Sequence, residues 1–112
     1  MNYTKNLYIP ANTPESNPVK EQIIIREKVI TRIDITIDTV ATKGLVGVKI
    51  FGGKAGFRTF SHPTNAEEWI RKSDTWTGRI ELSDPYLPID ILGISPSTGL
   101  QHLAIISIQT EP

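Results

Sequence analysis

The sequence has no cysteine among its 112 residues, which excludes disulfide bonds and thiolate metal sites. It also has no long hydrophobic run, because the longest runs are about five residues and a membrane-spanning helix needs ~20. Neither sign of charge predominates, since Lys plus Arg and Asp plus Glu each number 12. A nucleic-acid-binding protein usually carries a basic excess. We therefore expect neither a membrane nor a nucleic acid as a partner.

The chain also lacks a signal peptide's apolar segment in its first residues, MNYTKNLYIP. We therefore expect synthesis in the cytoplasm of a cell. The length is typical of a single domain. A net charge of zero leaves little electrostatic repulsion between copies, so self-association is permitted.

No catalytic or metal-binding motif stands out. The two histidines, His62 and His102, lie far apart in the sequence, whereas a metal site needs several ligands brought together. The segment GVKIFGGK, residues 47 to 54, has the glycine spacing of a phosphate-binding loop. However, Gly53 stands where that loop requires lysine, and Ala55 stands where it requires a hydroxyl residue. A hairpin turn explains this segment better.

Carboxylates that could act as a catalytic pair are spread over predicted outward faces, a loop and one possible helical turn: Asp34, Asp38, Glu67, Glu68, Glu81 and Asp84. No pair stands out among them. Nothing places a serine beside a histidine with an orienting acid. We predict that the protein is not an enzyme and holds no cofactor and no metal.

What the sequence does contain is a strong strand pattern. VITRIDITID, residues 29 to 38, alternates with a period of two, which is typical of a half-buried strand. The apolar face would hold Val29, Thr31, Ile33, Ile35 and Ile37. Residues 22 to 26 form a further strand or the first half of a longer one. Other strands are predicted at residues 44–51, 57–60, 76–82, 89–95 and 100–109.

The last of these segments, LQHLAIISIQ, has apolar residues on both faces, so we expect a central strand. Residues 61 to 75 do not alternate, and Asn65 followed by Glu68 permits one short helical turn. The absence of strand–helix alternation excludes a parallel sheet. The sequence predicts an all-β fold, a single antiparallel β-sandwich that is jelly-roll-like, with about seven or eight strands.

The segment LYIPANTPESNPVK, residues 7 to 20, differs from the rest because it contains three prolines. Pro10, Pro14 and Pro18 bias the preceding residues toward extended conformations. We predict an extended N-terminal arm over residues 1–18 and a β-sandwich domain over residues 19–112. The arm docks on its own domain or on a neighbouring molecule, and a neighbour is favoured. Deleting the arm would then leave the fold intact.

Aromatic residues outside the strong strands are candidates for binding. Trp76 shares a face with Ile80 and Leu82, which favours a core position. Trp69 could anchor a loop, lie in a protein interface or stack on a sugar, and Tyr86 lies in another loop. The candidate interface residues are therefore Leu7, Tyr8, Ile9, Pro10, Pro14, Pro18, Trp69 and Tyr86.

The order of these features resembles small β-sandwich virion proteins of phages and prophages. The shared features are LYIPANTPESNPV, a long alternating strand, GLVGVKIF with a glycine turn, a loop with Trp69 and Ile70, and two closing strands. The resemblance implies a capsid decoration or minor head protein that binds the major capsid protein or other virion subunits. It would be a homo-oligomer located in the virion after assembly in the host cytoplasm. The alternative is a carbohydrate- or ligand-binding module that uses Trp69 and Tyr86.

Overall fold

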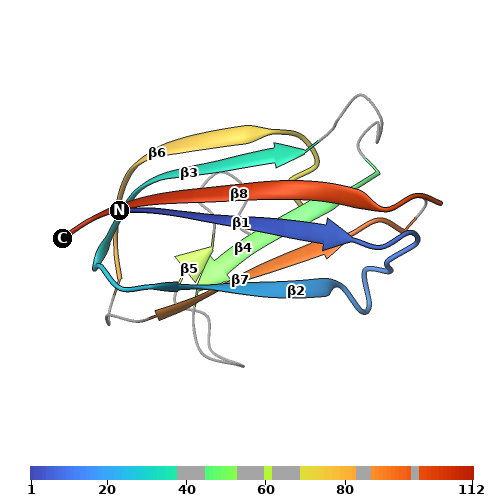
Figure 1. Ribbon diagram of the computed structural model, residues 1–112, viewed down its shortest axis with the longest axis horizontal. Coiled ribbons are helices and arrows are strands. Elements are labelled where there is room, and N and C mark those ends of the chain that lie inside the picture. Colours follow the sequence, from blue (N-terminus) through green and yellow to red (C-terminus); the bar gives the residue numbers. More distant parts are fainter. Residues whose placement is uncertain (38–44, 53–59, 62–68, 83–86, 97–98) are drawn as a thin grey trace.

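The computed structural model describes residues 1–37, 45–52, 60–61, 69–82, 87–96 and 99–112. These residues form eight β-strands and no helix (Figure 1). The strands are β1 (Asn2–Ile9), β2 (Val19–Ile25), β3 (Val29–Ile37), β4 (Gly47–Gly52), β5 (Phe60–Ser61), β6 (Asp74–Glu81), β7 (Leu87–Ile94) and β8 (His102–Glu111).

The strands form two four-stranded sheets in which every pair is antiparallel. We call them sheet A, with the order β1-β8-β3-β6, and sheet B, with the order β2-β7-β4-β5. The chain crosses between the sheets at nearly every connection, and its first and last strands are neighbours. This order is that of a jelly roll. The predicted all-β, jelly-roll-like antiparallel sandwich is therefore confirmed, and β8 is a central strand as expected.

The core between the sheets is built almost entirely from isoleucine. Apart from Leu7, every large side chain that is fully buried is an isoleucine, and these come from both sheets: Ile9, Ile25, Ile30, Ile33, Ile35, Ile50, Ile89, Ile91, Ile94, Ile106 and Ile108. A β-branched side chain loses little rotamer freedom on a pleated surface, so a chain rich in isoleucine favours strands and packs them efficiently.

β3 contains a β-bulge, so the predicted assignment of its residues to two faces is partly wrong. The register with both neighbouring strands shifts between Ile30 and Arg32. The bulge leaves Thr31 outside the regular pairing, and its hydroxyl donates a hydrogen bond to the Gln109 carbonyl at 3.3 Å. As a result Ile30, which strict alternation assigns to the outer face, is buried in the core. An extra residue in one strand reverses the alternation on one side of it.

The N-terminal segment is extended as predicted, but its first half is a strand of sheet A. β1 pairs with β8 along its whole length, from Asn2 opposite Gln109 to Ile9 opposite His102. Leu7 and Ile9 are 0% exposed. The predicted boundary between an arm over residues 1–18 and a domain over 19–112 is therefore wrong for residues 2–9. Their own alternation, with Leu7 and Ile9 on one face, explains the result.

Residues 10–18 form the loop that leads from β1 in sheet A to β2 in sheet B (Figure 1). Three residues, Arg26 and a bend at Glu27 and Lys28, then separate β2 from β3. The two strands lie in different sheets, which settles the choice between one long strand and two. Trp76 is half-buried and packs against the core from β6, in partial agreement with the predicted core position. The possible helical turn at Asn65 lies outside the described residues.

Gly93 is the point where β1 meets sheet B. A Cβ atom added at Gly93 would lie 2.8 Å from the Ile9 Cδ1 atom and 2.8 Å from the Leu7 Cδ2 atom. Contacts this short force buried side chains out of their rotamers. The missing side chain at Gly93 therefore lets Leu7 and Ile9 reach the opposite sheet.

We predict that Gly93→Ala lowers the free energy of unfolding by about 1–3 kcal/mol, because it overpacks the core at β1. Gly99→Ala is the matched control, since a Cβ atom there would have no neighbour within 4 Å. Urea unfolding followed by circular dichroism measures both variants. Equal stability of the two variants would contradict this role for Gly93.

Candidate functional site

The described residues hold no site of the kinds that support catalysis by a metal. No group of three or more His, Asp or Glu side chains among them could hold a metal ion. Within the same ranges there is also no helix long and apolar enough to cross a membrane. The surfaces of the two sheets and the loop at residues 10–18 remain as candidate binding sites.

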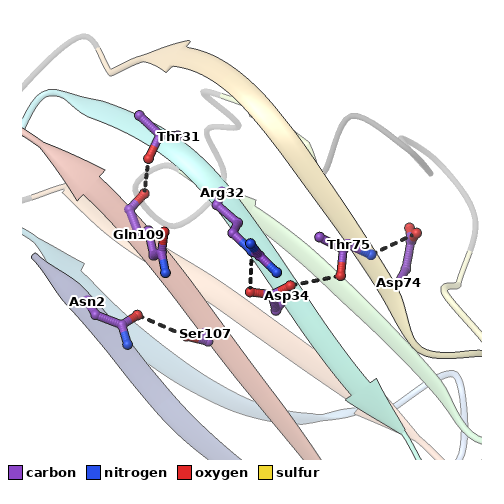
Figure 2. A network of polar contacts seen from close by, with 8 residues as sticks. All are labelled: Asn2, Thr31, Arg32, Asp34, Asp74, Thr75, Ser107 and Gln109. Carbon is purple, nitrogen blue, oxygen red and sulfur yellow. Dashed lines mark hydrogen bonds and ion pairs between the residues drawn. The ribbon is translucent and has the colours of Figure 1, made fainter.

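The outer face of sheet A carries a row of polar residues that crosses the sheet. Ser107 on β8, Asp34 on β3 and Thr75 on β6 lie directly opposite one another. The Asp34 carboxylate accepts hydrogen bonds from Arg32 Nε at 2.8 Å and from the Thr75 hydroxyl at 2.8 Å (Figure 2). The hydrogen bond from Arg32 is the main reason why the pKa of Asp34 lies below its usual value. The charge of Asp34 is thus paired with that of Arg32, and Arg79 likewise contacts Glu81 and Glu111.

The same face continues onto β1, where Ser107 Oγ donates to Asn2 Oδ1 at 2.9 Å (Figure 2). The polar outward residues of sheet A are mostly short, and none among the described residues is a lysine: Asn2, Thr4, Asn6, Arg32, Asp34, Thr36, Thr75, Thr77, Arg79, Glu81, Ser107, Gln109 and Glu111. Short side chains lose little rotamer entropy when they are covered. Depletion of lysine is typical of protein interfaces.

One end of this face is apolar. Tyr8, Leu103 and Ile105 are 55%, 39% and 37% exposed. Tyr8 lies directly opposite Leu103, and Ile105 lies opposite Asn6 on the same face. Neighbours on one face of a sheet are within reach of one another, so the three side chains form a patch. We call the patch and the polar rows together the outer face of sheet A.

The loop at residues 10–18 is held to the end of β7 by Ser95, whose side chain is 0% exposed. Ser95 Oγ donates to the Pro10 carbonyl at 2.5 Å and accepts from the Thr13 amide at 3.1 Å. The Ser95 amide donates in turn to the Thr13 carbonyl at 2.9 Å. Asn12, between these anchors, has a φ of 57°, in the left-handed region that asparagine tolerates better than most residues. The loop therefore has a fixed, specific conformation.

Trp69 ties the same loop to sheet B. Its indole Nε1 donates to the Glu15 carboxylate at 2.7 Å, and the Lys49 ammonium lies 4.6 Å from the centre of its ring. Gly47 provides the space beneath it, because a Cβ atom there would lie 2.8 Å from Trp69 Cβ. The indole N–H thus binds Glu15, and the ring contacts Lys49. These contacts make Trp69 an anchor of the loop.

A shallow hollow of about 370 Å³ lies in the curve of this loop. It is lined by Pro10, Ala11, Asn12, Thr13, Pro14, Asn17, Pro18 and Val19. The lining contains no charged residue. The hollow therefore presents backbone and side-chain amide groups to a ligand, but no charged side chain that could bind a charged ligand tightly.

The predicted interface residues fall in different places. Leu7 and Ile9 are core residues, so their prediction as surface contacts is wrong for this structure, because both point inward from β1. Tyr8, between them, is on the outer face of sheet A. Pro10 and Pro14 are exposed and Pro18 is half-buried.

Pro14 and Trp69 are far apart in the sequence. The structure brings them close, because Trp69 donates a hydrogen bond to Glu15, the residue after Pro14. Tyr86 lies outside the described residues. Sequence reasoning did not single out Leu103 and Ile105, because a strand that is apolar on both faces gives no sign of which residues face solvent. It also missed Ser95, since a serine at the end of a strand gives no recognisable signal.

A second polar cluster closes the opposite end of the sandwich. The Glu27 carboxylate accepts from the Thr110 hydroxyl at 2.6 Å and from the Tyr3 hydroxyl at 2.8 Å. These bonds, first that from Thr110, hold the pKa of Glu27 below its usual value. Burial, with a smaller contribution from Glu27, raises the pKa of Tyr3. The cluster ties β1 and β8 to the bend after β2.

Compared with protein-family models and with curated proteins, the sequence matches no family and no individual protein. The site therefore has to be interpreted from its own geometry.

We predict that Ser95→Ala lowers the free energy of unfolding by about 1–3 kcal/mol, because it leaves the buried Thr13 amide without its acceptor and removes one of the two hydrogen bonds to the Pro10 carbonyl. Ser107→Ala removes a hydroxyl of the exposed face and is the matched control, with an expected change of roughly 0.5 kcal/mol or less. Thermal or urea unfolding measures both. If Ser95→Ala has no larger effect than Ser107→Ala, Ser95 does not anchor the loop.

We also predict an acid-sensitive contribution from Glu27. Its pKa is lower in the folded protein than in the unfolded chain, so its stabilising effect is present above the ordinary glutamate pKa of about 4.3 and is lost as the pH falls through the folded value. Glu27→Gln should therefore be less stable at pH 7 and lose less stability on acidification. The measurement is the urea midpoint across the acidic range. Glu81→Gln, at a carboxylate that is 74% exposed, controls for the change in net charge.

Proposed function

We propose that this protein is a non-enzymatic structural subunit of a phage particle, of the capsid decoration or minor head type, and that it binds neighbouring virion subunits through the outer face of sheet A. The observation that carries the proposal is the composition of this face. It combines an exposed apolar patch at Tyr8, Leu103 and Ile105 with short polar residues and internally paired charges. Short side chains on such a face lose little entropy when they are covered, and burial of its exposed apolar side chains is favourable.

The outer face of sheet B supports the choice of sheet A by contrast. It carries Lys20 and Lys49, and Lys20 contacts the nearly buried Asp90 at 3.8 Å. Gln22 Nε2 also donates to Asp90 at 2.7 Å. Lysine has a long, strongly hydrated side chain and is depleted in interfaces. The outer faces of the two sheets thus differ in lysine content among the described residues, and the face without lysine is the better candidate for an interface.

The size of the face suggests how it would work on a shell. Four strands about 4.8 Å apart and about eight residues long cover roughly 500 Å², whereas a stable interface buries about 800 Å² on each partner. A single contact would therefore be weak. Attachment at many symmetry-related sites, each adding a small free energy, would still resist separation of the shell subunits.

The alternative function, a carbohydrate- or ligand-binding module, would use Trp69 and Tyr86, of which Trp69 is among the described residues. Stacking on a sugar needs a free aromatic face, and the Trp69 ring is in contact with Lys49 and hydrogen-bonded to Glu15. These contacts favour the anchoring role and make the alternative weaker. A calorimetric titration with oligosaccharides, compared between the protein and Trp69→Ala, would distinguish the two functions.

We predict that Ile105→Lys weakens attachment to particles about tenfold or more, because it places a charge in the apolar patch. Ile24→Lys is the matched control, since Ile24 is exposed to a similar extent on sheet B. The measurement is the occupancy of each variant on particles of the phage or prophage that carries this sequence, determined after gradient purification. Equal occupancy of the two variants would exclude the outer face of sheet A as the binding surface, and absence of the protein from purified particles would exclude the virion role.

A further inference from the structure

β1 can be separated from the rest of the sandwich. It lies at an edge of sheet A, and among the described strands β8 alone is hydrogen-bonded to it (Figure 1). Separating it from the sheet therefore breaks one strand ladder and no other. Its main attachments are the ladder with β8, the packing of Leu7 and Ile9 over Gly93, and the Lys5–Glu21 ion pair at 3.4 Å. All of these could be made equally well by β1 of another copy.

We propose that β1 is exchanged between two copies of this chain, so that residues 2–9 of each copy complete sheet A of the other. Leu7 and Ile9 of one copy would then fill the space above Gly93 of its partner. The exchanged contacts are the same as those within one copy, so the two forms differ in free energy mainly in the linker at residues 10–18 and in the entropy of association. The equilibrium between them depends on protein concentration.

The linker has the properties of a hinge for such an exchange. It contains Pro10, Pro14 and Pro18, which favour an extended chain. Nine extended residues span about 30 Å, enough to reach a neighbouring molecule. In the closed form the linker must reverse direction between β1 and β2, and this reversal includes the left-handed conformation of Asn12. An opened linker would not require it.

Contacts within the loop oppose opening. The hydrogen bonds of Ser95 with Pro10 and Thr13, and the bond between Trp69 and Glu15, are made in the closed form. The balance between these bonds and the left-handed Asn12 therefore sets the exchange equilibrium. A change at residue 12 should shift this balance without touching β1, the core or the outer face of sheet A.

The proposal does not depend on the virion role, because it concerns only pairs of this chain. It identifies the partner as a second copy and leaves the outer face of sheet A free on both copies. Contact between two outer faces, by contrast, would be sensitive to Ile105→Lys and insensitive to residue 12. The two kinds of self-association can therefore be distinguished.

The first test compares Asn12→Val with Asn12→Gly in the full chain. A β-branched residue strongly disfavours the left-handed region and glycine adopts it freely. Light scattering coupled to size exclusion, over a range of protein concentrations, measures the dimer association constant. In Asn12→Val this constant should rise about tenfold for each linker that opens, and the exchanged dimer contains two such linkers. Asn12→Gly should move the equilibrium toward the monomer. An equal dimer constant in both variants, or monomers throughout at millimolar concentration, would overturn the proposal.

The second test traps the exchanged strand. Leu7 and Ala104 face each other inside the core, out of reach of any contact between outer faces. Leu7→Cys and Ala104→Cys, carried by separate copies and refolded together, should form a disulfide between copies. Leu7→Cys mixed with Ile108→Cys is the matched control, because Ile108 lies opposite Tyr3 instead. If Leu7→Cys does not fold, the comparison at residue 12 still decides. No excess of cross-linking over the control would refute the exchange.

Discussion

The packing of Leu7 and Ile9 against Gly93 is the contact on which the rest of the structure depends. These two side chains belong to sheet A, and Gly93 belongs to sheet B, so the contact joins the sheets at the side where β1 and β2 meet. The same contact positions the loop at residues 10–18, because Pro10 follows directly and is held by Ser95, two residues after Gly93. A change at this point would therefore disturb the core, the loop and the pairing of β1 together.

The two outer faces of the sandwich differ in the residues that they expose. Sheet A presents paired charges, short polar residues and an apolar patch, whereas sheet B presents lysines and the Trp69 contact with the loop. Function in a protein with few reactive groups depends on which surface can be covered at least cost.

The strong alternation of β3 and β4 made the sandwich predictable from the sequence, because period-two hydrophobicity reports the buried face directly. The role of β1 was missed because the prolines that follow it dominated the interpretation, although Leu7 and Ile9 already alternate with Tyr8. The bulge at Thr31 could not be foreseen, since one unpaired residue leaves no pattern of its own. The contact between Glu15 and Trp69 is also a product of the fold, which brings together segments distant in the sequence. The exposure of Leu103 and Ile105 could not be predicted, because an apolar residue in a central strand can still face solvent.

The pairing of the first strand with the last has a mechanical consequence. β1 and β8 are antiparallel, with Asn2 opposite Gln109, and the two ends of the described chain lie together at one end of the sandwich (Figure 1). A pulling force applied between these ends would act across the strands, and it would load their hydrogen bonds one after another in the manner of a zipper. A load applied between the loop at residues 10–18 and the end of β8 would instead run along the strands and be shared by many bonds at once. The sandwich is therefore mechanically anisotropic, weak along one direction of pull and resistant along the other.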